Sequence, residues 1–245
     1  FRQPEWIDRA AEILRTFGIE GLVVIGGDGS LHGGEELSRR GIKVMGLPGT
    51  IDNDLNYTDY TIGFDTAVNT VLDAISKIRD TSSAHDRTTV IEVMGRHCGD
   101  IALYAGLAGG AECVLIPEEP VDVNAVIRKI IEGSNRGKLH SIIIKAEGTE
   151  PSSEELVKKI EHLTGKETRL VVLSYLQRGG SPSLRDRLLA TMCAAKAVEL
   201  LKEDSPSKAI GTSEGKVTAY DLSEALDFPK EVDKEMFNLI DVLSR

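Results

Sequence analysis

The sequence predicts an α/β fold built on parallel sheets, and three observations support this prediction. Short apolar runs such as GLVVI (21–25), VIEVM (90–94) and SIIIKA (141–146) alternate with segments of helical length. These runs are apolar throughout, as expected for strands that helices cover on both faces. The 245 residues are also enough for two compact lobes, each with its own core.

The individual elements follow in order along the chain. The first helix begins near Pro4, which suits a first helical position, and stops at Gly18. The segment 203–216, rich in Ser, Gly and Lys, should be the softest region. Further strands are expected at 42–47 (IKVMGL), 113–117 (CVLIP) and 170–174 (LVVLS), and further helices at 65–79, 100–109, 122–135, 153–163, 184–202 and 231–243.

Composition excludes several classes of protein. The net charge of −10 argues against a nucleic-acid surface, which needs clustered Lys and Arg. No apolar run approaches the roughly 20 residues that cross a bilayer, and no leader sequence opens the chain, so we expect neither a membrane span nor secretion. The three cysteines form no CxxC pair, which predicts neither a disulfide framework nor a zinc site and makes the reducing cytoplasm the expected location.

Polar motifs follow most of the predicted strands. The ends of parallel strands meet at one edge of a sheet, where α/β proteins bind ligands, so these loops should converge on one cleft. The motifs are IGGDGS (25–30), PGTIDND (48–54), MGRHCG (94–99), EGTE (147–150) and LQRGGSP (176–182).

GGDGS suits a phosphate cradle. Glycines let backbone N–H groups approach an anion, and a helix N-terminus beginning at Ser30 adds favourable partial charge. An ordinary Gly-Asp-Gly turn explains the motif equally well. A carboxylate beside a phosphate loop would repel the anion unless Mg²⁺ bridges the carboxylate and the phosphate, so Asp28 suggests a magnesium ion.

The two acids of PGTIDND can divide the work of phosphoryl transfer. One carboxylate accepts the proton of an attacking hydroxyl while the other holds Mg²⁺, and Asp52 and Asp54 fit these roles. An Asx-rich turn that caps the next helix is the structural alternative. Four arginines in or beside the other strand-end segments favour phosphoryl transfer, because arginine binds dianions well. They are Arg87, Arg96, Arg169 and Arg178.

Taken together, these motifs resemble the bacterial type of the ATP-dependent 6-phosphofructokinase family. VVIGGDGS, GLPGTIDND, TIGFDTA, RDTSSAHDR, IEVMGRHCGD, ETR and QRGGSP match that family in order and at compatible spacing, from Phe1 nearly to the C-terminus. The resemblance implies two Rossmann-like lobes of three-layer architecture. Residues 1–64 with 178–225 would bind ATP, and residues 65–177 with 226–245 would bind the sugar phosphate and effectors.

The resemblance also implies roles for matching residues. Asp52 would be the general base for the 1-hydroxyl of fructose 6-phosphate, Asp28 and Asp54 would serve Mg²⁺, and Thr50 and Arg96 would stabilise the transferring phosphoryl group. The nucleotide contacts would be Gly27, Asp28, Gly29 and Ser30, with Arg2 as a further ATP contact. The sugar-phosphate contacts from the same subunit would add Met94, Gly95, Glu147, Tyr175 and Arg178.

Regulation and assembly follow from the same resemblance. Arg87 and Arg169 match residues that reach into a neighbouring subunit's site, which implies a homotetramer. Arg79, Glu112, Arg136 and Lys138 match positions that bind ADP and phosphoenolpyruvate. A solvated helix end explains the NRGKLH segment around Arg136 equally well.

Two positions separate the possible phosphoryl donors. Pyrophosphate-using relatives typically carry Asp at the position of Gly29 and Lys at the position of Gly49. Two small residues leave space for the α-phosphate and ribose of a nucleotide, so we expect ATP as donor. A pyrophosphate-dependent enzyme and a catalytically silent fragment or regulatory subunit are the alternatives.

The chain departs from the family pattern in two places. The family's N-terminal strand and its GGDAPG-like loop, about a quarter of a subunit, have no counterpart before Phe1. Tyr175 stands where the bacterial family usually has His, and its phenol donates a hydrogen bond but carries no positive charge.

Overall fold

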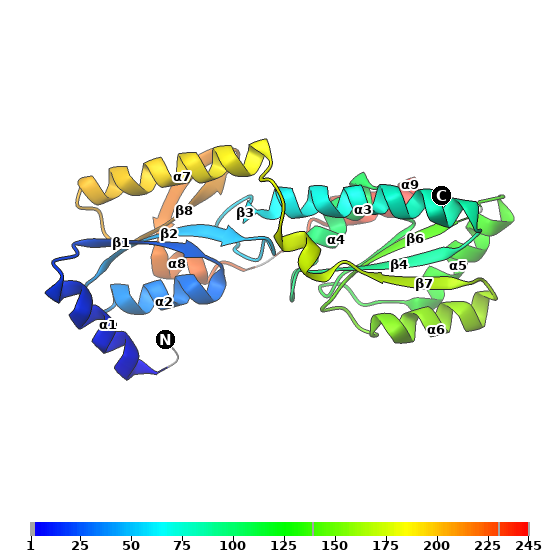
Figure 1. The fold of residues 1–245 in the computed structure, drawn as a ribbon, viewed down its shortest axis with the longest axis horizontal. Coiled ribbons are helices and arrows are strands. Elements are labelled where there is room, and N and C mark those ends of the chain that lie inside the picture. Colours follow the sequence, from blue (N-terminus) through cyan, green and yellow to red (C-terminus); the bar gives the residue numbers. More distant parts are fainter. Residues whose placement is uncertain (1–2, 139, 230, 245) are drawn as a thin grey trace. The chain divides into compact units, whose positions relative to one another are not determined.

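The computed structural model describes residues 3–138, 140–229 and 231–244 (Figure 1). The chain divides into two compact units, and it crosses between them a few residues later than expected. Unit 1 comprises Phe1–Asp65 and Pro182–Lys230, and unit 2 comprises Thr66–Ser181 and Glu231–Arg245.

Unit 1 is built on a mixed five-stranded sheet in the order β1-β2-β8-β9, with β3 paired to the end of β2. Only the β8–β9 pair is antiparallel. The strands are β1 (Gly21–Gly26), β2 (Lys43–Thr50), β3 (Ile62–Gly63), β8 (Lys208–Ser213) and β9 (Lys216–Asp221).

The hairpin of β8 and β9 contradicts the expected softness of segment 203–216. Ala209 and Ile210 are fully buried in the sheet, so this polar stretch forms an interior strand. Glu214 and Gly215 connect the strands with φ of 51° and 74°, the left-handed conformation that both central residues of a type I′ hairpin adopt. Much of the Ser, Gly and Lys content of this segment, from Lys208 to Lys216, belongs to the hairpin.

Helices cover both faces of the unit 1 sheet (Figure 1). On one face, residues of α1 (Pro4–Thr16), α2 (Asp28–Ser38) and the unexpected short α8 (Leu222–Leu226) form a core with Val44 and Ala209. On the other face, α7 (Leu184–Lys202) packs Leu189, Cys193 and Ala197 onto Met45 and Ile210.

Unit 2 is built on a four-stranded sheet in the order β5-β6-β4-β7, and every pair is parallel. All six residues of β6 are buried, as the unbroken apolar run SIIIKA predicts. The predicted α/β class with parallel sheets is confirmed. The strands are β4 (Thr88–Val93), β5 (Cys113–Leu115), β6 (Ser141–Ala146) and β7 (Thr168–Val172).

The helices of unit 2 also lie on both faces. α5 (Val123–Asn135) and α6 (Ser153–Thr164) pack against Val90 and Ile143. Figure 1 shows α3 (Phe64–Ala84), α4 (Asp100–Ala108) and α9 (Lys234–Leu243) on the opposite side. A 3₁₀ helix, η1 (Ser174–Arg178), replaces the expected end of the last strand.

Within the described ranges, no helix combines the length and apolar character that crossing a membrane requires. The three cysteines are buried and reduced.

Candidate functional site

The turn between β1 and α2 forms the first part of the candidate site. A Cβ on Gly26 would lie 2.5 Å from the Ser30 side chain, and one on Gly27 would lie 3.3 Å from the Thr50 Cβ. The glycines therefore bring this turn close to the end of β2. Helix α2 begins at Asp28, two residues before the expected Ser30, so Asp28 occupies the first turn and Gly27 the N-cap.

The Asp28 side chain contacts a residue of the helix α2, which begins at Asp28. Its carboxylate lies 3.1 Å from His32 Nδ1, one turn further along α2, and both side chains are about half exposed. The backbone N–H groups of the first turn point toward the same N-terminus, where an anion is stabilised. Solvent access and the partial positive charge of the helix N-terminus make this turn able to receive a phosphate.

The segment after β2 fixes two carboxylates through a residue between them. The Asp52 N–H donates to the Thr50 hydroxyl at 3.2 Å, and Asp52 is only 9% exposed. Asn53 adopts φ of 55° and is buried, and its side-chain oxygen accepts the Thr61 N–H at 2.9 Å. Because Asn53 is held in this left-handed conformation, it fixes the course of the backbone between Asp52 and Asp54. Sequence reasoning missed Asn53, although asparagine is enriched in this conformation.

Gly29 and Gly49 have different surroundings. In the part of the chain that the structure describes, a Cβ on Gly29 would have no atom within 4 Å. A Cβ on Gly49 would lie 3.0 Å from Ile25 Cγ2 and 3.2 Å from the Gly26 N. Gly29 therefore leaves open space at the start of α2, whereas Gly49 is required for β2 to pack against β1.

In unit 2, the loops after β4 and β6 are tied to each other. The Arg96 N–H donates to the Glu147 carboxylate at 3.0 Å, and the Glu147 N–H donates to the Val93 carbonyl at 2.8 Å. A Cβ on Gly148 would lie 2.0 Å from the Arg96 carbonyl oxygen. Gly95 and Arg96 have φ of 139° and 55°, so the loop turns sharply and the exposed Arg96 projects from it.

The 3₁₀ helix η1 joins this edge of the sheet through Gln177. Its side-chain oxygen accepts the Met94 N–H at 3.2 Å, and its amide nitrogen donates to the Ser174 carbonyl at 3.1 Å. Gln177 is 1% exposed, whereas Tyr175 is 72% exposed. The Arg178 guanidinium lies 4.9 Å from the centre of the Tyr175 ring. Met94, Arg96, Glu147, Tyr175 and Arg178 are thus gathered at the carboxyl edge of one sheet, and Gln177 is a second residue that sequence reasoning missed.

Arg87 and Arg169 do not belong to that edge. Arg87 immediately precedes β4 and Arg169 is the second residue of β7, so both lie where these parallel strands begin. The expectation that they lie with the strand-end loops is wrong for this unit, because both arginines lie at the amino ends of these parallel strands.

One carboxylate holds both of these arginines. Arg87 Nε donates to Glu167 at 2.7 Å, and Arg169 pairs with the other oxygen of the same carboxylate. The hydrogen bond from Arg87, together with the charges of both arginines, lowers the pKa of Glu167. The edge therefore presents two cations aligned by a single anion.

Three of the four expected effector residues surround the segment between α4 and β5. Arg79 donates to the carbonyls of Gly109 and Gly110. The buried Glu112 carboxylate lies 2.5 Å from the Lys138 ammonium and accepts the Ile142 N–H. Arg136, in contrast, is the C-cap residue of α5, where its N–H donates to the Glu132 and Gly133 carbonyls. Arg2, an expected ATP contact, lies outside the described residues.

Comparison with known protein families finds one family that matches most of the chain. The sequence profile described as Phosphofructokinase matches residues 1–201. The whole chain is 56% identical to an ATP-dependent 6-phosphofructokinase of Clostridium acetobutylicum, and 54% identical to ATP-dependent 6-phosphofructokinase 1 of Clostridium perfringens. It spans 76% of the length of each.

Solved structures have the same fold. The chain matches phosphofructokinase from Saccharomyces cerevisiae with a TM-score of 0.86 and 29% identity, over 99% of this chain and 36% of that one. A pyrophosphate-dependent phosphofructokinase from Marinobacter aquaeolei matches with a TM-score of 0.84 and 23% identity, over 94% of this chain and 65% of that one. At that identity the second match concerns the fold alone.

Proposed function

Because the chain belongs to the phosphofructokinase family, we propose that it transfers the γ-phosphoryl group of MgATP to the 1-hydroxyl of fructose 6-phosphate. The products are fructose 1,6-bisphosphate and ADP, the committed chemistry of glycolysis. The observation that carries this proposal is the contact of the Gly-rich turn with Thr50, which joins an anion-binding helix start to the buried Asp52.

Asp52 accepts the proton of the sugar hydroxyl as it attacks. The bond to Thr50 and the turn at Asn53 limit the positions that this carboxylate can take. A general base in such a fixed position contributes roughly 10²–10⁴-fold to the rate. Positioning of the two substrates and neutralisation of the phosphoryl charge by Thr50 and Arg96 supply most of the remainder.

The residues present suit a magnesium ion that is shared with substrate. Mg²⁺ in kinases uses one or two carboxylates and takes its other ligands from phosphates and water. Among the described residues no three acidic, His or Cys side chains form a metal cluster, but Asp28 and Asp54 lie on two adjoining segments of unit 1. These two carboxylates would hold the ion, which when bound neutralises charge on the nucleotide phosphates.

The sugar phosphate is bound by residues of unit 2. Arg96 and Arg178 provide the cations for a phosphate dianion, with Glu147, Met94 and Gly95 as sugar contacts. Tyr175 contributes a hydroxyl donor in place of a charged group. Arg87 and Arg169 act in the site of a neighbouring copy, which makes the active form a homotetramer.

ATP is the proposed donor. The relatives that are 52–56% identical carry ATP-dependent names, whereas the pyrophosphate-dependent structures are only 22–23% identical. The open space at Gly29 lies beside Asp28, where the nucleotide phosphates would bind. An aspartate at Gly29 would place a second negative charge in that space.

Arg79, Glu112, Arg136 and Lys138 are the proposed contacts for ADP and phosphoenolpyruvate. The clustering of three of them around Gly109–Glu112 supports a shared role. The proposed location, in keeping with glycolysis, is the cytoplasm.

A coupled assay for fructose 1,6-bisphosphate tests the proposal, with Mg²⁺, fructose 6-phosphate and either ATP or pyrophosphate. We expect turnover with ATP alone, and at least a hundredfold lower kcat in Asp52→Asn with little change in the KM for the sugar. Asp73→Asn, which removes an exposed carboxylate from α3, is the matched control and should retain full activity. Turnover with pyrophosphate, or near-normal kcat in Asp52→Asn, would contradict the proposal. Sugar binding without turnover would indicate a silent binding subunit.

A further inference from the structure

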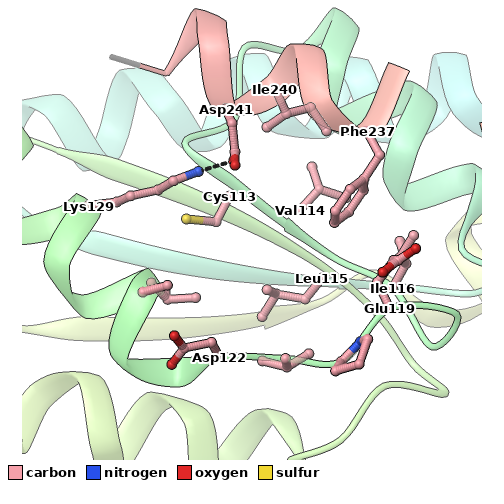
Figure 2. A pocket seen from close by; sticks show the side chains of 14 residues that line it. Cys113, Val114, Leu115, Ile116, Glu119, Asp122, Lys129, Phe237, Ile240 and Asp241 are labelled. Carbon is pink, nitrogen blue, oxygen red and sulfur yellow. Dashed lines mark hydrogen bonds and ion pairs between the residues drawn. The ribbon is translucent and has the colours of Figure 1, made fainter. Parts of the chain in front are cut away.

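A pocket of about 220 Å³, partly open to solvent, lies in unit 2, and none of the residues discussed above as substrate or effector contacts lines it. It is lined by β5, the segment Ile116–Asp122, the start of α5 and the C-terminal helix α9 (Figure 2). Because these elements come from distant parts of the sequence, no local sequence motif predicts this pocket.

The body of the cavity is apolar. Figure 2 shows Leu115 and Val114 from β5, and Phe237 and Ile240 from α9, around the same space. Cys113 adds a buried thiol whose pKa is raised by burial to about 12, so it lines the wall as a neutral group. A dry cavity of about 150 Å³ holds benzene, which leaves room here for two or three further heavy atoms.

The charged groups at the cavity differ in how fully they are paired. Lys129 pairs with Asp241, which joins α5 to α9 across the cavity (Figure 2). Asp122 accepts the Asn124 N–H at 2.9 Å and pairs with Arg128. Glu119 is partly buried, and its carboxylate makes no hydrogen bond or ion pair within the described residues. The pocket therefore offers one negative charge that no described protein group neutralises, and a cationic ligand would pair with it.

From this combination we propose that the cavity binds a small organic cation, with an apolar body the size of a benzyl group and an ammonium head that pairs with Glu119. An anion of the same shape meets three carboxylates and one ammonium that is already paired, so it is rejected. A neutral analogue fills the space but leaves Glu119 without a partner. The proposal concerns binding alone and does not depend on the proposed kinase activity.

One wall of the cavity also touches the loop that carries Arg96. A Cβ on Gly99 would lie 2.4 Å from the Ile116 side chain, and the Gly99 N–H donates to the Glu118 carboxylate at 2.8 Å. Ile116 lines the cavity, so a ligand there changes the surroundings of the Gly99 amide. That amide provides a local reporter of occupancy.

Benzylamine, toluene and phenylacetate share a ring but differ in charge, and titrating each into the 245-residue chain tests the proposal. Calorimetry gives the Kd, and amide NMR shows whether Gly99 shifts while Gly165, at the far end of α6, does not. We expect a Kd on the order of 1 mM for benzylamine and at least tenfold weaker binding of phenylacetate. Glu119→Gln should weaken benzylamine about three- to tenfold and leave toluene unchanged. Glu132→Gln, an equal charge change on α5 outside the lining, should alter neither ligand.

Ala125→Phe, at a partly exposed lining position on α5, fills the space and should abolish binding of benzylamine and toluene without unfolding the chain. If that variant fails to fold, the Glu119→Gln comparison and the Gly99 shift decide the question by themselves. Equal affinity for benzylamine and phenylacetate, unchanged binding in Glu119→Gln, or a ligand shift that spares Gly99 would each overturn the proposal.

Discussion

The side-chain oxygen of Gln177 accepts the backbone N–H of Met94 at 3.2 Å, in a position where Gln177 is 1% exposed. With its amide nitrogen, Gln177 also binds the Ser174 carbonyl. One buried side chain therefore fixes the position of η1, which carries Tyr175 and Arg178, relative to the loop that carries Arg96.

Replacing Gln177 should disturb the sugar-phosphate contacts before any others. Gln177→Leu leaves the Met94 N–H buried without an acceptor, which costs about 1–3 kcal/mol of unfolding free energy. We expect a several-fold higher KM for fructose 6-phosphate and an unchanged KM for ATP. Urea unfolding and steady-state kinetics measure the two effects. Leu176→Ala, at the exposed neighbouring position of η1, is the control and should lie closer to the parent protein; equal losses in both variants would contradict a role for the Met94 bond.

Asn53 should matter to catalysis although its side chain reacts with nothing. Asn53→Ala replaces a residue that tolerates positive φ better than alanine does, and it leaves the Thr61 N–H unsatisfied, a cost of about 1–3 kcal/mol. Gly accepts this backbone conformation, so Asn53→Gly should be less destabilised than Asn53→Ala. Both variants should lower kcat, because Asp52 and Asp54 lose their fixed geometry. Thermal unfolding and the coupled assay test this order, and an Asn53→Ala variant with parental stability would refute it.

Gly148 is predicted to be intolerant of even one methyl group. A Cβ there would lie 2.0 Å from the Arg96 carbonyl oxygen, a backbone atom that can move only if the loop moves. Gly148→Ala should therefore lose stability and weaken sugar-phosphate binding. Gly29→Ala, on a helix with open space around it, is the matched control and should be neutral or slightly stabilised. Similar melting temperatures for the two variants would show that the close approach at Gly148 is not maintained.

Glu167 should titrate below the ordinary carboxyl pKa of 4.5. Because its folded pKa is lowered, the stability that it contributes is present above the unfolded pKa and is lost as the pH falls through the folded pKa. Arg87→Met should raise the NMR titration midpoint of Glu167 more than Arg169→Met does, since the hydrogen bond from Arg87 is the largest cause. Lys166→Met, which removes a cation paired with Asp86, is the control and should leave the midpoint nearly unchanged. The reverse order of the two arginine variants would count against this geometry.

Gly29→Asp tests the donor. The structure predicts that the variant folds normally, because the side chain enters open space and a carboxylate is favourable in the first turn of a helix. The KM for ATP should rise at least tenfold, from repulsion of the nucleotide phosphates, while sugar binding is retained. Gly29→Asn has the same size without the charge and should be affected less. Unchanged ATP kinetics in Gly29→Asp would remove this turn from the nucleotide site.

Local sequence patterns correctly predicted the helices and strands whose stabilising interactions are local. The buried strand β6 and the helix starting near Pro4 are confirmed, because burial on two faces and first-turn chemistry are visible in a few neighbouring residues. The hairpin of β8 and β9 was missed because its stability comes from pairing with β2 and burial of Ala209 and Ile210, not from its polar composition. Gln177 and Asn53 were overlooked as positioning residues because their partners, Met94 and Thr61, are far away in sequence or across a turn.

The sequence by itself determined the α/β class, the family and the carboxylates and arginines available for chemistry, since each depends on residue type and spacing along the chain. Only the tertiary structure decided which of those residues share an edge of a sheet. Arg87 and Arg169 differ from Arg96 and Arg178 because they lie at the amino ends of β4 and β7, where Thr88 pairs with Thr168. That pairing is a long-range interaction between backbones. It brings the two arginines together at that edge, where Glu167 binds both, and no single segment contains the information to do so.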